Sequence, residues 1–264
     1  MIDLRYDVGG RCSSCNRRQA VYLRRSSGER LCTTCFERSI IKSVKRSLRE
    51  VKELKPGTLI LVITTLDKLV EGLTLSYVLN KIERAYGCRV LNALSIALDD
   101  VHIVTQLSKV HEVSDGIQHI IIPLRSSIPS INSSFRDYLK LCLKIAVAVS
   151  INIVALPLTL NDVSEVVVNS LFDGDLKSAG LMHSFKVDGV TAVIPFYKLT
   201  TSEVYAYSYL RNIYNLDIDL LMPPTPICHR ASRKVLRELI NDLSMNNPEL
   251  TQTLSKFIEL LKSI

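Results

Sequence analysis

The sequence predicts an α/β protein: a doubly wound sheet of five parallel strands, preceded by a small cysteine-rich module and followed by C-terminal helices. Three observations support this class. Apolar runs of strand length alternate with helical patterns after residue 58, two Cys-x-x-Cys pairs stand near the N-terminus, and 264 residues suffice for one large domain with an appendage. We therefore divide the chain into an N-terminal module at 1–55, an α/β domain at 56–222 and a C-terminal helical segment at 223–264.

The N-terminal module carries the positive charge of the chain. Residues 1–55 hold fourteen Lys and Arg against six Asp and Glu, a local charge of +8, whereas the remaining residues sum to −1. A basic appendage on a neutral body is typical of a protein that binds a polyanion. A solvated basic surface without a ligand is the alternative.

The cysteine pairs Cys12–Cys15 and Cys32–Cys35 predict a metal site. Each Cys-x-x-Cys aims two thiolates at one ion, and two such pairs complete a tetrahedral site for zinc. The alternating segment 19–25 and the turn at 26–29 lie between the pairs and indicate a zinc ribbon. We therefore expect a structural Zn²⁺. Redox-active Cys-x-x-Cys pairs are the competing interpretation.

Neither a signal peptide nor a membrane segment is predicted. The first five residues lack an apolar stretch, and the most apolar segment, 139–160, contains Lys140, Lys144 and Pro157. We therefore expect a cytoplasmic protein with reduced thiols and no contact with a membrane.

A basic amphipathic helix is predicted at 36–52, directly after the ribbon. Its apolar residues recur at spacings of three and four, and its basic residues occupy the other face. Such a face beside a zinc ribbon suits the phosphates of a folded RNA. The residues that we expect to contact RNA are Arg17, Arg18, Arg24, Arg25, Lys42, Lys45, Arg46 and Arg49.

The α/β domain begins after residue 57. Its near-continuous apolar strands alternate with helices, as in a parallel sheet that is covered on both faces. The predicted strands are 59–63, 89–98, 117–123, 152–157 and 189–195. The predicted helices are 68–86, 99–113, 135–150, 161–172, 201–211, 230–243 and 248–261. Ligands of such sheets bind beyond the carboxyl ends of the strands, so a nucleotide would meet the segment after the first strand.

Short motifs accompany the ribbon and the basic helix. They are Tyr22-Leu23-Arg24-Arg25, Gly28-Glu29, Lys55-Pro56-Gly57, Ile194-Pro195-Phe196-Tyr197 and Cys228. With these motifs, nearly the whole chain resembles the tRNA 2-thiolation enzymes of the PP-loop (adenine-nucleotide alpha-hydrolase) superfamily. The resemblance implies a PP-loop fold and a role in the thiolation of tRNA.

The nucleotide-binding loop of active family members is not preserved. That loop reads Ser-Gly-Gly-Lys-Asp-Ser, and a phosphate cradle of this kind needs bare backbone N–H groups. The family's second nucleotide motif falls on residues 157–162, where only Asp162 is kept in type, and Asn161-Asp162 is more simply a helix N-cap. The resemblance therefore implies that this chain binds no ATP. The altered loop positions are Thr64, Thr65, Leu66, Asp67 and Lys68.

Active members also hold an iron–sulfur cluster or a persulfide on three cysteines. Two of these would fall on residues 130–134, which contain no cysteine, and the third matches Cys228. Because one thiolate cannot hold a cluster, we expect no iron–sulfur cluster. We predict no catalytic residue; Cys228 is a weak candidate inherited from an active ancestor.

These departures predict a non-catalytic, tRNA-binding subunit of a complex that 2-thiolates the wobble uridine of tRNA. Its expected partners are tRNA and an active thiolase paralogue of the same fold, with a ubiquitin-like sulfur carrier acting through that paralogue. Two alternatives stay open. One is an active sulfurtransferase with a remodelled nucleotide site that uses Cys228, and the other is a zinc-stabilised RNA-binding scaffold unrelated to thiolation.

Overall fold

The computed structural model describes residues 8–49, 51–97, 117–124, 135–172, 174, 184–213, 238–240, 242, 247, 253, 256 and 257. The predicted helix at 99–113 and Cys228 lie outside these ranges, as does most of the two predicted C-terminal helices. Within the described ranges, every helix is too short or too polar to span a lipid bilayer.

The N-terminal module is a two-stranded antiparallel ribbon followed by a helix. Strand β1 (Tyr22–Arg24) pairs with β2 (Glu29–Leu31), and the turn between them uses Gly28 at a φ of +69°. Helix α1 (Thr33–Leu48) begins two residues after β2. It buries Phe36, Ile40 and Val44 on one face, which confirms the amphipathic pattern seen in the sequence.

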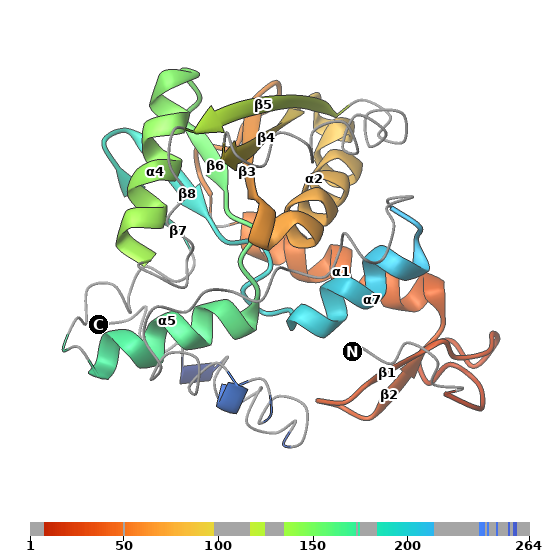
Figure 1. The fold of residues 1–264 in the computed structure, drawn as a ribbon. Helices are drawn as coiled ribbons and strands as arrows, with labels where there is room; N and C mark the ends of the chain where they lie inside the picture. Colours follow the sequence, from red (N-terminus) through yellow and green to blue (C-terminus); the bar gives the residue numbers. More distant parts are fainter. Residues whose placement is uncertain are drawn as a thin grey trace.

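The main sheet has six strands in the order β5-β4-β3-β6-β8-β7 (Figure 1). Neighbours from β5 to β8 are all parallel, as predicted for five strands. Their bounds are Leu59–Thr65 for β3, Arg89–Ala97 for β4, Gln118–Leu124 for β5, Ile153–Ala155 for β6 and Val190–Val193 for β8.

The prediction of five strands is wrong, because the sheet has a sixth strand at one edge. Strand β7 (Ser184–Val187) pairs antiparallel with β8 through a two-residue turn at Asp188 and Gly189. Both turn residues have positive φ, +49° and +80°, as in the tight hairpin turns that Asp-Gly favours. The Asp-Gly pair was the signal in the sequence for this extra strand.

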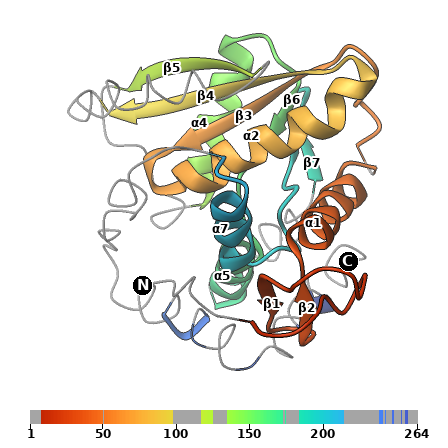
Figure 2. The ribbon, with the colours of Figure 1, turned by 90° about the vertical axis from the view of Figure 1, so that its right-hand side faces the viewer.

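Helices cover both faces of the sheet (Figure 2). Helices α1, α2 (Leu69–Glu83) and α7 (Thr201–Leu210) pack on one face, and α4 (Phe135–Ala148) and α5 (Leu160–Phe172) on the other. The buried residues of β3 alternate between the two cores, with Ile60 and Val62 on the first face and Leu61 and Ile63 on the second. Two short 3-10 helices, Leu66–Lys68 and Arg84–Tyr86, flank α2.

The ribbon is fixed to the α/β domain by aromatic rings and one arginine. Tyr22 of β1 stacks on Phe36 of α1 with ring centroids 4.1 Å apart, and Phe36 meets the edge of Tyr207 of α7 at 6.2 Å. Arg24 Nε donates to Glu203 Oε1 over 2.8 Å. The cysteine-rich module is therefore packed onto α1 and α7.

Candidate functional site

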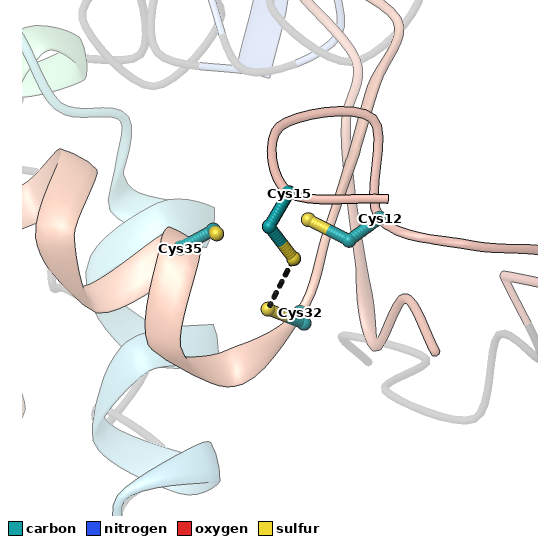
Figure 3. A group of neighbouring side chains, drawn as sticks. All are labelled: Cys12, Cys15, Cys32 and Cys35. Atoms are coloured by element: carbon teal, nitrogen blue, oxygen red, sulfur yellow. Dashed lines mark hydrogen bonds between the residues drawn. The ribbon is translucent and has the colours of Figure 1, made fainter. Parts of the chain in front are cut away.

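The four N-terminal cysteines converge on one point (Figure 3). Cys12 and Cys15 lie on a tight turn before β1, Cys32 follows β2, and Cys35 lies in the first turn of α1. Their four Sγ atoms all lie within 4.8 Å of one another, and those of Cys15 and Cys32 are 3.9 Å apart. The turn is closed by the backbone bond from Asn16 N–H to Cys12 C=O over 2.8 Å.

The protein environment makes these thiols unequal in acidity. Burial opposes ionisation of Cys12, but hydrogen bonds from the backbone N–H groups of Cys32, Cys15 and Ser14 lower the pKa of its thiol to about 6. The Ser14 hydroxyl favours ionisation of Cys35, yet burial and the three neighbouring thiols raise its pKa to about 11. Four thiolates at this spacing repel one another, so a cation is needed to hold them all ionised.

The cysteine site is closed on one side and open on the other. Cys12, Cys32 and Cys35 are buried, whereas Cys15 is partly exposed. Next to the cysteine site lies a hollow of about 330 Å³. It is lined by Cys15, Arg17, Arg18, Thr34, Cys35 and Arg38. The four thiolates form a metal-binding site beneath a basic surface.

The second candidate site is the switch point of the sheet, between β3 and β6, where ligands of doubly wound folds bind. The altered loop begins there with Thr64 and Thr65, which are both buried at the end of β3. Thr64 Oγ1 donates to Asn92 Oδ1 of β4 over 2.7 Å. A Cβ added at Gly72 of α2 would lie 2.1 Å from the same Oγ1, so the helix backbone packs directly on this side chain.

A buried ion pair joins the two segments on which the sequence analysis placed the altered nucleotide motifs. Lys68 ends the short 3-10 helix after β3, and its Nζ lies 2.6 Å from Oδ1 of Asp162 in the first turn of α5. Glu71 Oε1 is 3.2 Å from the same ammonium group. Asp162 Oδ2 also accepts hydrogen bonds from Thr159 N–H and Thr159 Oγ1, each over 2.8 Å, and so helps to cap the start of α5. The predicted N-cap at Asn161-Asp162 is placed too late, because α5 begins at Leu160.

Charge attraction outweighs desolvation in this ion pair. Burial favours the neutral form of Lys68, but Asp162 and Glu71 raise its pKa above the ordinary value. Burial likewise disfavours the Asp162 carboxylate, but Lys68 lowers its pKa. Glu71 differs, because burial raises its pKa despite the nearby lysine. Lys68 and Asp162 are therefore both charged at neutral pH and neutralise each other.

All the residues expected to contact RNA are exposed except Arg24. Arg17, Arg18 and Arg25 are exposed on the ribbon, and Lys42, Lys45, Arg46 and Arg49 are exposed on α1. Arg24 is different: its side chain is only 18% exposed and donates to Glu203, Glu29 and Ser39. The structure therefore gives Arg24 a bracing role between the ribbon and α7. Sequence reasoning missed its partner Glu203, whose only local signal is the Thr200-x-x-Glu203 capping box of α7.

Comparison with known proteins finds the same fold in a solved structure. No protein-family model and no curated protein sequence matches the chain. Among solved structures, the U34-tRNA thiolase NcsA from Methanococcus maripaludis with its 4Fe–4S cluster matches at 18% identity and a TM-score of 0.74, over 97% of this chain and 88% of that one. The NMN synthetase from Francisella tularensis matches at 10% identity and a TM-score of 0.46, over 89% of this chain and 97% of that one. The chain therefore shares its fold with the U34-tRNA thiolase, as expected from the sequence.

One expectation about cofactors is wrong. The sequence predicted structural zinc and excluded both ATP and an iron–sulfur cluster, but the thiolase of the same fold carries a 4Fe–4S cluster and this chain has four cysteines that could hold a metal. The expectation that no iron–sulfur cluster binds considered only the cysteine positions at 130–134 and 228. It overlooked that four clustered thiolates are also the ligand set of iron–sulfur clusters. Such a cluster therefore belongs among the groups that the cysteine site could hold.

Proposed function

We propose that the chain is a non-catalytic, tRNA-binding subunit of a complex that 2-thiolates the wobble uridine of tRNA. Its fold, which it shares over nearly its whole length with a U34-tRNA thiolase, supports the link to tRNA thiolation. The basic ribbon and the basic face of α1 support the binding of tRNA, because phosphate contacts position a nucleic acid without reading its sequence.

The observation that carries the non-catalytic part is the buried pair of Lys68 and Asp162. These two residues come from the two segments in which active family members hold their nucleotide. Here each neutralises the other inside the protein core, so neither side chain is available to orient or polarise a reacting group. Catalysis then falls to a partner, which we propose is an active, ATP-dependent thiolase paralogue of the same fold. A ubiquitin-like sulfur carrier would act through that paralogue.

The test is to reconstitute tRNA thiolation with a paralogue from the same source that keeps the nucleotide-binding loop Ser-Gly-Gly-Lys-Asp-Ser. The full-length chain, the paralogue and the mixture are each incubated with tRNA, ATP and a sulfur donor, and 2-thiouridine is measured by mass spectrometry of the digested tRNA. We expect no product from this chain alone, co-purification of the two proteins, and more product from the mixture than from the paralogue alone.

A Cys228→Ser variant is the matched control, and we expect it to stimulate the paralogue as well as the unmodified chain does. Single-turnover thiolation by this chain alone, abolished by Cys228→Ser, would instead identify an active sulfurtransferase. Failure to associate with the paralogue, together with preferential binding of ribosomal RNA, would identify a scaffold unrelated to thiolation.

A further inference from the structure

A basic groove of about 670 Å³ lies between the ribbon, α1 and the segment that leads into α7. The ribbon contributes Ser26 and Ser27 from its turn, and the α/β domain contributes Lys198 and Thr200. Lys256 also lines it. The groove is therefore built by the N-terminal module and the α/β domain together.

One face of helix α1 forms a wall of the groove. Its lining residues recur at spacings of three and four, which places them on one side of the helix. They are Cys35, Arg38, Ser39, Lys42, Ser43 and Arg46. At a rise of 1.5 Å per residue, the row from Arg38 to Arg46 is about 12 Å long. Guanidinium, ammonium and hydroxyl groups thus follow one another along this wall, and all three are common donors to phosphate oxygens.

The acidic residues of the groove do not cancel this charge. Its lining holds six basic side chains and two acidic ones, Glu29 and Glu203, and both acids are bonded to Arg24. Among the residues that the structure describes, no carboxylate forms an ion pair with Arg38, Lys42 or Arg46, and all three are exposed. Lys198 of the α/β domain also lines the groove, and its Nζ lies 5.2 Å from the centroid of the Tyr197 ring.

We propose that the sugar–phosphate backbone of tRNA runs through this groove, between Arg38, Lys42 and Arg46 of α1 and Lys198 of the α/β domain. This inference rests on the proposed function, which requires tRNA binding, and it names the site of that binding. It adds Arg38 and Lys198 to the residues expected from the sequence. It also removes Arg24 from direct contact, since that residue ties the ribbon wall to Glu203.

The experiment measures tRNA binding by the full-length chain at several salt concentrations. We compare the unmodified chain with Lys42→Glu/Arg46→Glu and with Lys198→Glu. Each lost phosphate contact lowers the slope of log K against log salt by about 0.7 to 0.9. We expect a slope change of about 0.8 for Lys198→Glu, about twice that for the double variant, and an affinity loss of about tenfold or more near 0.1 M salt.

The matched control is Lys144→Glu, an equal charge reversal at an exposed site on α4, across the sheet from α1. We expect this variant to keep most of the affinity and the full slope. If a reversal variant does not fold, as judged by circular dichroism, the neutral changes Lys42→Gln/Arg46→Gln and Lys198→Gln replace it, with the same direction expected.

The outcomes separate this inference from the proposed function. If the chain binds tRNA but the groove variants keep its affinity and slope, the groove is not the tRNA site, while the proposed function stands. Loss of paralogue or sulfur-carrier binding in these variants, with tRNA binding intact, overturns the groove inference in favour of a protein partner. If the groove variants lose tRNA but the chain never stimulates thiolation, the groove inference stands and the proposed function falls.

Discussion

At the scale of single residues, the buried ammonium group of Lys68 has the largest expected effect on stability. It is buried with one carboxylate at 2.6 Å and a second at 3.2 Å. Burying an ion pair costs desolvation free energy, and removing one partner leaves an uncompensated charge in the core. The two carboxylates are not equivalent, because Lys68 lowers the pKa of Asp162 while burial raises that of Glu71.

This difference gives a prediction for matched isosteric variants. We expect Asp162→Asn to lower the free energy of unfolding by about 3 to 5 kcal/mol, because it removes the shorter ion pair. Glu71→Gln should cost clearly less, since the charged form of Glu71 is already disfavoured and the amide oxygen can still accept from Lys68. Urea denaturation of both variants measures the two losses. Equal losses would mean that the two carboxylates stabilise Lys68 equally.

The same pair predicts how stability depends on pH. The pKa of Asp162 is lower in the folded chain than in the unfolded chain. Its contribution is therefore fully present above the unfolded value of about 3.9 and is lost as the pH falls through the lower folded value. We expect the stability difference between the unmodified chain and Asp162→Asn to shrink below about pH 4. A difference that stays constant down to pH 2 would contradict this assignment.

At the scale of elements, we expect the ribbon to depend on its metal site for stability. Its two strands have three residues each, and such a hairpin is marginally stable by itself. We expect removal of the metal with a chelator, or Cys32→Ser, to unfold the ribbon and leave the α/β sheet folded. Hydrogen exchange should then rise at residues 20–31 and stay low in β3 and β4. Metal analysis and the visible absorption spectrum of the untreated protein identify the bound group.

Cys88→Ser is the control for that experiment. Cys88 lies outside the four-cysteine group, and its thiol donates to the backbone oxygen of Lys55 over 3.4 Å. We therefore expect this variant to keep the full metal content. Loss of metal from Cys88→Ser but not from Cys32→Ser would contradict the position of the cysteine site.

Elements with a strong local pattern could be predicted from the sequence. The continuous apolar runs of β3 and β6 and the helical period of α1 are strong local patterns, and the matched Cys-x-x-Cys pairs predicted one shared site, which the structure has. The sequence also located both segments of the switch point. It could not show that Lys68 reaches across 94 positions to Asp162, because the two residues are brought together only by the order of the strands. The sequence could not show the bracing role of Arg24 for the same reason, since the burial of Arg24 depends on Glu203 in α7, which is distant in the sequence.

At the scale of the whole molecule, the question is how firmly the ribbon is joined to the α/β domain. The basic groove has one wall in each, so its shape depends on this junction. Glu37 of α1 contributes to the junction, because its carboxylate accepts hydrogen bonds from Lys81 of α2 and from the Tyr207 hydroxyl. Arg24 contributes the most direct link, since it bonds to Glu29 in the ribbon, to Ser39 in α1 and to Glu203 in α7.

We predict that Arg24→Ala weakens this junction without removing a phosphate contact. The variant leaves the carboxylate of Glu203 largely buried and without its arginine, which should cost about 2 kcal/mol of stability. Because Arg24 braces the groove, tRNA affinity should fall while the salt slope stays near that of the unmodified chain. Arg25→Ala, the exposed neighbour, is the matched variant and should show the reverse: nearly unchanged stability and a smaller slope. If instead Arg24→Ala reduces the slope and leaves stability unchanged, Arg24 contacts phosphate directly and the ribbon is held by its aromatic stack alone.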